Sequence, residues 1–332
     1  MKTVSINVMN LCVPCENHCR YCLLSYDGRV TGADYKRSEV FAQKFYDWLR
    51  CNRPELSFLF GFGYSMEHPA LLDAIRFCQS IGSATGEFLQ LDGMRMRSDS
   101  ELLALLRSLK QAGVQLLNLT FYGTEAYHDR FAARKGDFDL MLRTLKQANL
   151  AGLDVSVDIP LTHENVHQTE DLITQLSSFT ISRLSCFVPH CEGRGALLEP
   201  VRFTVQGYEA LGAQVKPLFN RSRFRTEGEW LQDIPAEPER RVLTLTLTNE
   251  NIDRYERLGF DKILAELEAM DDAYYRTVPS FTQLLHTYAD RSNQKLYSAR
   301  DLYLHYQRRY IAEHALTLYD VNDERQNFSR RI

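Results

Sequence analysis

Hydrophobic and polar positions in the first two thirds of the chain alternate between two kinds of segment. Short, nearly continuous apolar runs are typical of buried parallel strands, and longer stretches with apolar residues at helical spacing are typical of amphipathic helices. The expected strands cover residues 4–12, 56–63, 87–93, 116–123, 154–160 and 181–189. The first expected helix has Ser38 as its N-cap and continues through Leu49. The other expected helices cover residues 69–81, 99–112, 137–151, 165–178 and 204–216.

Strands and helices in this strict alternation predict an α/β fold with a parallel sheet and helices on its outer side. Right-handed crossovers would curl the sheet into a partial (β/α)6 TIM-like barrel. A doubly wound sheet is the structural alternative. In a barrel, functional residues gather at the carboxyl ends of the strands, so we look for candidate chemistry there.

The alternation ends after residue 217. Residues 219–240 are charged and irregular, and residues 241–248 alternate with period two, which predicts a strand. Two further stretches are expected to be helical, 249–270 and 297–310. We therefore expect a barrel domain over residues 1–217 and a smaller α+β C-terminal extension over 218–332 that covers the barrel.

Composition narrows the class of protein. The chain has 332 residues, of which 44% are hydrophobic and 25% charged, and its net charge is −4. These values are ordinary for a globular protein, and the charge argues against nucleic acid as a partner because no overall basic field is present. No apolar run is long enough to cross a membrane and no signal peptide is visible, so we expect a cytoplasmic protein. Its eight cysteines are then expected to be thiols or metal ligands rather than a disulfide framework.

Three of these cysteines, Cys15, Cys19 and Cys22, have Cx3CxxC spacing directly after the first expected strand. Three thiolates on one tight loop can hold three irons of a [4Fe–4S] cube and leave the fourth iron open. A closed electron-transfer cluster uses four cysteines instead, and structural zinc usually shows two CxxC pairs or Cys/His pairs. A zinc knuckle that uses His18 with two or three of the cysteines is the alternative.

This spacing, with the aromatic Tyr21 before the last cysteine, resembles the radical S-adenosylmethionine (SAM) superfamily. The resemblance implies that the open iron takes the amino and carboxylate groups of SAM. Electron transfer from the cluster would then cleave SAM to a 5′-deoxyadenosyl radical, which abstracts a hydrogen atom from a substrate. It also implies an external electron donor such as a ferredoxin or a flavodoxin.

Other strand ends match the family in order. Gly63, His68 and Pro69 match a GGEPLLHP-like stretch, but Phe62 and Tyr64 stand where the pattern has Gly and Glu. A glutamate side-chain contact to SAM is therefore not expected. A backbone contact to the SAM amino group survives the change because glycine allows close approach of a ligand.

The resemblance assigns cofactor roles residue by residue. Cys15, Cys19 and Cys22 would ligate the cluster, and Tyr21 would shield it or lean on the adenine. The other positions implied in SAM binding are Gly61, Phe62 and Gly63 at the second strand end, and Thr120 and Asp158, which would hydrogen-bond the ribose or carboxylate. The structural alternatives are a plain strand-to-helix turn at residues 61–63, a core aromatic at 21, a strand former at 120 and an ion pair at 158.

No residue is assigned to the substrate chemistry itself. Three candidates lie near strand ends: Tyr122, His190 and Cys191. Cys191 would be a hydrogen-atom donor, a ligand of an auxiliary cluster, or an inert thiol. Four arginines after strand ends could grip an anionic substrate or the SAM carboxylate, with a solvated or salt-bridged surface role as the alternative: Arg95, Arg97, Arg130 and Arg134.

The substrate class rests on one further resemblance. His128-Asp129 followed by Gly136-Asp137-Phe138 looks like the HD…GxF segment of the branch that modifies peptides and proteins, which also contains small-molecule enzymes. No cysteine follows Cys191, so the auxiliary-cluster cysteines of many peptide-modifying relatives are missing.

Three hypotheses follow. A radical SAM enzyme acting on a peptide or protein comes first, and one acting on a small metabolite or nucleotide is the alternative. An enclosed mouth with convergent arginines would favour the metabolite, and an open groove the peptide. A non-catalytic iron–sulfur, SAM-binding or redox-sensing module is the hypothesis of another class.

Overall fold

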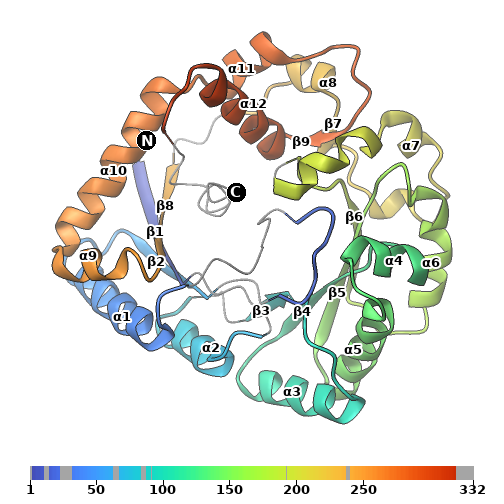
Figure 1. The fold of residues 1–332 in the computed structure, drawn as a ribbon, viewed down its shortest axis with the longest axis horizontal. Coiled ribbons are helices and arrows are strands. Elements are labelled where there is room, and N and C mark those ends of the chain that lie inside the picture. Colours follow the sequence, from blue (N-terminus) through green and yellow to red (C-terminus); the bar gives the residue numbers. More distant parts are fainter. Residues whose placement is uncertain are drawn as a thin grey trace.

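The computed structural model describes residues 2–10, 15–22, 32–62, 67–83, 87–90, 92–191, 193–236 and 240–318. In the view of Figure 1, strands stand around a central space and helices lie outside them. This is the α/β architecture with parallel strands that the alternation predicts, and it is consistent with a partial TIM-like barrel.

The six expected strands are present, most of them shorter than expected. They are β1 (Lys2–Asn10), β2 (Ser57–Gly61), β3 (Phe88–Gln90), β4 (Leu116–Thr120), β5 (Asp154–Pro160) and β6 (Arg183–Phe187). The helices that cover them are α1 (Tyr35–Asn52), α2 (Leu71–Ser80), α3 (Asp99–Gln111), α5 (Asp137–Ala151) and α6 (Thr169–Leu176). Each connection therefore returns the chain to the same edge of the sheet, as parallel pairing requires.

Strand pairing divides the wall of the barrel into two parallel sheets. One has the order β3-β4-β5-β6, and the other has β1 in the middle, in the order β2-β1-β8, where β8 is Arg240–Leu247. Met9 of β1 lies beside both Gly61 and Thr246. The strand expected in the C-terminal extension is therefore part of the barrel wall and does not only cover it.

Residues 224–232 and 281–313 of the C-terminal part form a small unit that stands between β6 and β8 in Figure 1. It pairs β7 (Phe224–Arg225) with β9 (Tyr297–Ser298) in antiparallel fashion. Its helices α8 (Glu227–Gln232), α11 (Phe281–Tyr288) and α12 (Ala299–Glu313) bury a cluster of their own around Trp230 and Leu285. The division of the chain at residue 217 stays a prediction.

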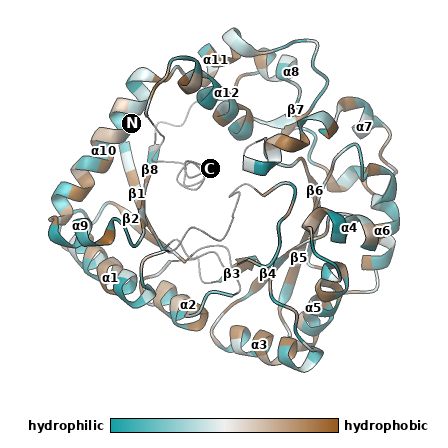
Figure 2. Ribbon diagram, in the orientation of Figure 1, coloured by the Kyte–Doolittle hydropathy of each residue, from teal (hydrophilic) through white to brown (hydrophobic). Residues whose placement is uncertain are grey.

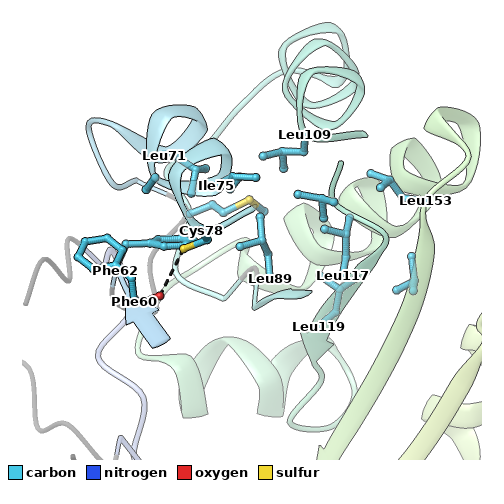
Figure 3. Packing of buried hydrophobic residues seen from close by; sticks show 14 of the residues in the cluster. Phe60, Phe62, Leu71, Ile75, Cys78, Leu89, Leu109, Leu117, Leu119 and Leu153 are labelled. Atoms are coloured by element: carbon cyan, nitrogen blue, oxygen red, sulfur yellow. Dashed lines mark hydrogen bonds between the residues drawn. The ribbon is translucent and has the colours of Figure 1, made fainter. Parts of the chain in front are cut away.

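The two sheets share one hydrophobic core. Helices α2 and α3 pack their apolar sides over β2, β3 and β4, with Ile75, Leu89 and Leu109 among the residues that meet there (Figure 3). The Cys78 thiol donates to the carbonyl of Phe60 over 3.3 Å. Peripheral helices carry both hydrophobic and hydrophilic residues in Figure 2, as expected of helices that bury one side only. Side-chain packing thus joins β2 to β3, which are in separate sheets.

Two helices in the first half of the chain, α1 and a short helix after β4, differ from the prediction. Ser38 does not cap α1; Asp34 does, because its carboxylate accepts from the backbone N–H of Arg37 over 3.0 Å. Ser38 is buried inside the helix and accepts from Asn10 Nδ2 over 2.8 Å. The short helix α4 (Glu125–Ala132) was not predicted at all, since two turns of helix give too little periodicity to detect.

Two further helices differ from their expected bounds near a glycine. The helix expected over 204–216 is only α7 (Val205–Glu209), which ends before Gly212, a residue that weakens helix propagation. The helix expected over 249–270 is divided into α9 (Ile252–Arg257) and α10 (Phe260–Thr277), and Gly259 caps the second. Among the helices described, none combines the length and apolar content that a membrane crossing needs.

Burial of His68 makes folding sensitive to acid. Its Nδ1 accepts from the N–H of Ala70 over 3.1 Å, while Nε2 is buried without a partner among the described residues. Burial lowers the pKa of His68 from 6.5 to about 4. As pH falls below about 6.5, the unfolded chain binds a proton that the folded chain does not, so the folded state loses stability.

We expect His68→Asn to reduce this loss, since asparagine can accept from the same N–H and does not titrate. Between about pH 7 and about pH 4.5, the free energy of unfolding of the wild type should fall by roughly 2–3 kcal/mol more than that of the variant. Urea denaturation of the metal-free chain at both pH values measures this free energy of unfolding. The exposed His286→Asn is the control and should behave like the wild type; equal pH dependence in all three chains would refute the assignment.

Candidate active site

The segment that carries the three cysteines, residues 15–22, is fastened by its backbone to three parts of the barrel. It contacts the turn after β3, the end of α4 and the segment after β6. The bonds run from Glu16 N–H to Gly93 O (2.9 Å), His18 N–H to Ala132 O (2.9 Å), Arg20 N–H to Phe131 O (3.0 Å) and Arg194 N–H to Cys22 O (3.0 Å). The structure around the segment thus holds it in place, in addition to the bond from Cys22 N–H to Cys19 O within the segment (3.1 Å).

The cysteine side chains lie at different depths. Cys19 is buried and its Sγ lies 3.1 Å from the hydroxyl of Tyr122, while Cys15 and Cys22 are half-buried. Burial raises the pKa of Cys15 to about 11 and also raises the pKa of Cys19, and the neighbouring thiols add to both shifts. Among the described residues, no three Cys, His, Asp or Glu side chains already form a metal-binding group.

Gly93 makes room for Cys15. Its φ is +73°, in the left-handed region that favours glycine, and a Cβ added there would overlap Sγ of Cys15. Both the turn and the contact require glycine at this position.

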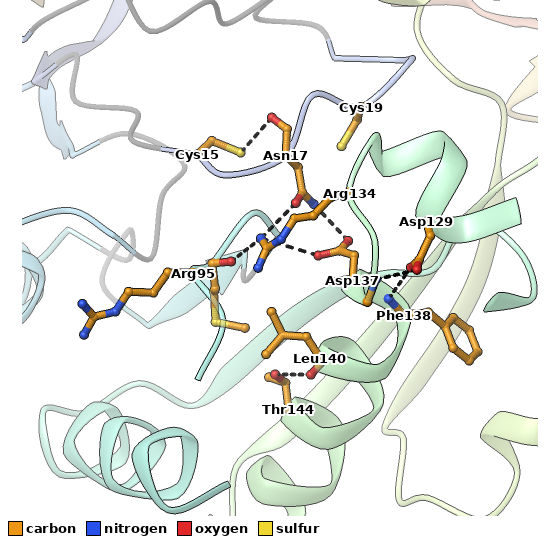
Figure 4. Close-up of polar contacts among 12 residues, drawn as sticks. Cys15, Asn17, Cys19, Arg95, Asp129, Arg134, Asp137, Phe138, Leu140 and Thr144 are labelled. Atoms are coloured by element: carbon orange, nitrogen blue, oxygen red, sulfur yellow. Dashed lines mark hydrogen bonds and ion pairs between the residues drawn. The ribbon is translucent and has the colours of Figure 1, made fainter. Parts of the chain in front are cut away.

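Below the cysteine segment lies a buried polar network, shown in Figure 4. Asn17 Nδ2 donates to Asp137 Oδ2 over 3.0 Å, and Arg134 donates to Asn17 Oδ1 over 3.1 Å. Nδ1 of His128 accepts from the N–H of Tyr122, so Nε2 carries the ring proton and donates to Asp137 Oδ2 over 3.0 Å. Asp137 thus ties the segment to α4 and α5.

The HD…GxF residues serve this scaffold. The carboxylate of Asp129 accepts from the backbone N–H groups of Gly136 and Phe138 and so holds the first turn of α5. His128 positions Asp137, as described above. The residues of this motif are used inside the protein, under the cysteine segment.

A pocket of about 450 Å³ lies against the inner face of β3 to β6. Tyr21, from the cysteine segment, forms part of its wall, and residues of the C-terminal part form another part. The lining residues are Tyr21, Phe88, Gln90, Asn118, Thr120, Asp158, Arg183, Ser185, Cys186, Phe187, Val188, His190, Leu218, Asn220, Arg223, Phe224 and Asp301. The segment that carries the thiols therefore forms part of the pocket wall through Tyr21.

Polar side chains meet across neighbouring strands in this pocket. Asp158 accepts from Asn118 Nδ2 over 2.9 Å and from the hydroxyl of Ser185. The N–H and hydroxyl of Thr120 donate to Asp92 over 3.0 and 2.7 Å. Burial raises the pKa of Asp92 to about 6 despite these bonds. The sequence analysis placed Asp92 in the expected strand over 87–93 and gave it no role, whereas β3 ends at Gln90.

At the carboxyl end of β6, His190 Nδ1 lies 2.5 Å from Asp301 Oδ1, which comes from α12. The buried thiol of Cys191 donates to the backbone carbonyl of Asp301 over 3.3 Å. His190 and Asp301 line the pocket.

Comparison with known proteins decides the family. The sequence model of the radical SAM superfamily matches residues 9–176, just over half of the chain. The chain belongs to the radical SAM superfamily. Enzymes of this superfamily perform SAM-dependent radical chemistry, and a [4Fe–4S] cluster and SAM are the cofactors that they use. No curated protein sequence matches the chain closely enough to count as a relative.

Solved structures of other radical SAM enzymes resemble it only distantly. SuiB of Streptococcus suis bound to SAM is 13% identical over 56% of this chain and 40% of SuiB, with a TM-score of 0.42. Coproporphyrinogen III oxidase (HemN) of Escherichia coli is 11% identical over 92% of this chain and 90% of HemN, with a TM-score of 0.43. The chain thus spans less than half of the length of SuiB, and the family assignment rests on the sequence model.

The residues present fit the cofactors of a radical SAM enzyme. Three thiols occur within eight residues, and the donor set is the thiolate that iron–sulfur clusters take. Bound iron deprotonates a coordinating thiol, which offsets the raised pKa of Cys15 and Cys19. Gly93 leaves space at Cys15, and a pocket adjoins the segment.

Of the predicted SAM positions, the structure brings some together and leaves others apart. Tyr21, Thr120 and Asp158 line the pocket. Gly61 ends β2 in the other sheet and Phe62 is buried beside the ring of His68, 6.0 Å between ring centroids. Gly63 lies outside the described residues. The backbone contact expected at 61–63 therefore stays a prediction.

The four arginines that the sequence offered as anion ligands are used within the protein or turned outward. Arg97 pairs with Glu67, Arg134 belongs to the network under Cys15, and Arg130 lies 5.0 Å over the ring of Tyr127. Arg95 is exposed and turned away from that network in Figure 4. The arginines that line the pocket are Arg183 and Arg223, which sequence reasoning missed.

Proposed function

We propose that Cys15, Cys19 and Cys22 hold a [4Fe–4S] cluster at the wall of this pocket and that the enzyme cleaves SAM there. When bound, the cluster supplies one electron to the sulfonium of SAM, which yields methionine and a 5′-deoxyadenosyl radical that abstracts hydrogen from the substrate. One observation carries the proposal. Tyr21, between the second and third cysteines, lines the pocket, so the thiols and a bound molecule are neighbours.

The chain's own residues have three tasks in this proposal. Gly93 and the network around Asp137 keep the cysteine segment in place. Thr120 and Asp158 present polar groups on neighbouring strands to a ligand, and Tyr21 forms part of the pocket wall.

The pocket favours a small molecule over the peptide that was our first choice. Support for a peptide came from the HD…GxF segment, whose residues hold the scaffold together. Residues of the C-terminal part, among them Leu218 and Asp301, form one side of the pocket. A pocket volume of about 450 Å³ is of the size that small ligands occupy.

Tyr122, a candidate for the substrate chemistry, is not among the residues that line the pocket and lies beside Cys19. It is 1% exposed, and its hydroxyl is 3.1 Å from Cys19 Sγ. A hydroxyl that donates to a ligand thiolate stabilises the reduced, more negative cluster. We therefore expect Tyr122→Phe to lower the midpoint potential of the reconstituted enzyme by roughly 40 mV, the one-electron equivalent of about 1 kcal/mol.

A spectroscopic redox titration measures this potential. Tyr127→Phe is the control, since the hydroxyl of Tyr127 contacts Thr162 and Glu164 rather than a cysteine. Equal potentials in the wild type and Tyr122→Phe would show that the hydroxyl does not donate to the thiolate.

The proposed function is tested by product formation under anaerobic conditions. The chain is reconstituted with iron and sulfide, reduced and given SAM, and 5′-deoxyadenosine is measured by mass spectrometry. Formation of 5′-deoxyadenosine supports the proposal. An intact cluster with bound SAM and no cleavage, even with a panel of small molecules added, would instead favour a binding or redox-sensing module.

A further inference from the structure

Two arginines of the pocket have no carboxylate partner. Arg183 is the first residue of β6, and Arg223 directly precedes β7. Both side chains line the pocket, and neither lies within ion-pair distance of a carboxylate in the part of the chain that the structure describes. Arg97 and Arg134, by contrast, have acidic partners. Charged side chains in a pocket that the protein itself leaves unpaired are available to a ligand.

The carboxylates of the same pocket are already engaged. Asp158 accepts from Asn118 and Ser185, and Asp301 contacts His190. Both carboxylates of the pocket thus have hydrogen-bond partners within the protein, whereas the guanidinium groups of Arg183 and Arg223 have no carboxylate partner among the described residues. This asymmetry favours a ligand that brings negative charge.

Both arginines are exposed to solvent, and Arg183 lies at the end of its strand opposite to Tyr21. Arg183 and Phe88 begin β6 and β3, whereas Tyr21 and His190 lie at the carboxyl ends of the strands. The five residues of β6 span about 13 Å. The guanidinium of Arg223 packs over the ring of Phe224, 5.5 Å from its centroid, which restrains it beside the pocket.

We propose that Arg183 and Arg223 bind the anionic group, a carboxylate or a phosphate, of a small-molecule substrate. This inference rests on the proposed function and names the substrate class of the same pocket. Arg183 would hold the anionic group near the amino end of β6, and the part of the substrate that reacts would extend toward Tyr21. Guanidinium suits this role because its fork of N–H donors matches both carboxylate and phosphate.

Anion binding to the reconstituted enzyme tests the proposal. The probes are glutarate, followed by saturation-transfer NMR, and inorganic phosphate, followed by ³¹P line broadening; uncharged glutaramide is the matched negative probe. Arg183→Gln and Arg223→Gln each remove one guanidinium from the pocket. Arg107→Gln, on the exposed side of α3, is the control.

We expect a probe to bind the wild type and Arg107→Gln, and to bind each pocket variant about tenfold more weakly. Binding of glutarate alone identifies a carboxylate site, and binding of phosphate alone a phosphate site. No binding to the wild type, equal binding to all four proteins, or equal binding of glutaramide overturns the proposal. 5′-Deoxyadenosine formation by the wild type is measured in parallel, so failure of the proposed radical chemistry would be seen separately from failure of anion binding.

Discussion

Cys19→Ala is expected to abolish 5′-deoxyadenosine formation, to the level of a protein-free control. The cluster needs three thiolates, and Cys19 is the buried one of the three cysteines. Iron content after reconstitution should fall from about four irons per chain. The measurement combines iron analysis with mass spectrometry of the product.

Cys51→Ala is the matched control. Cys51 is an exposed thiol on α1 and is remote from the cysteine segment. It should keep both the iron and the activity. Retention of a full cluster by Cys19→Ala, or loss of iron by Cys51→Ala, would contradict the ligand assignment.

Gly93→Ala should have the second largest effect, because a Cβ at this position overlaps Sγ of Cys15. The substitution costs about 1 kcal/mol of stability through its left-handed backbone, and in addition it displaces a thiol that we assign to the cluster. We expect iron loading and 5′-deoxyadenosine formation to fall severely while the chain still folds. Iron analysis and urea denaturation of the same preparations separate the two effects.

Gly82→Ala isolates the backbone effect. Gly82 has a φ of +69°, close to the +73° of Gly93, but a Cβ there would meet nothing within 4 Å. It should lose the same stability and keep the cluster. If both variants load iron equally well, the contact between Gly93 and Cys15 has no role in the site.

Much of the barrel was predictable because buried parallel strands leave a local signal. Runs such as that around Phe58 and Phe60 are apolar on both faces and end at glycine. The position of β8 was not predictable in this way. Its alternating pattern predicted a strand correctly, but nothing local says that Thr246 pairs with Met9, far away in the sequence.

The cysteine segment was predictable for a different reason, since its chemistry demands a fixed spacing on one loop. Residues that complete the site come from distant segments and carry no such spacing. Asp301 reaches His190 from α12, and Arg223 reaches the pocket from the segment before β7. The sequence suggested other arginines, such as Arg97, because they follow strand ends. In the structure, Arg97 forms an ion pair with Glu67 and so has a structural role.

The HD…GxF segment shows how a motif can be found correctly and its role left undetermined. The residues were recognised in the sequence, but their contacts decide what they do. His128 and Asp129 hold Asp137 and the start of α5, and Asp137 holds Asn17 of the cysteine segment. A motif that supports a cofactor loop carries no information about substrate, so the substrate class has to come from the pocket.

Electron paramagnetic resonance of the reduced, reconstituted enzyme tests the central claim most directly, that Cys15, Cys19 and Cys22 hold a cluster with one open iron that binds SAM. The account predicts the signal of a reduced [4Fe–4S] cluster that changes when SAM is added, and its absence in Cys19→Ala. A signal that SAM does not alter, or a chain that takes up zinc and no iron–sulfur cluster, would contradict it.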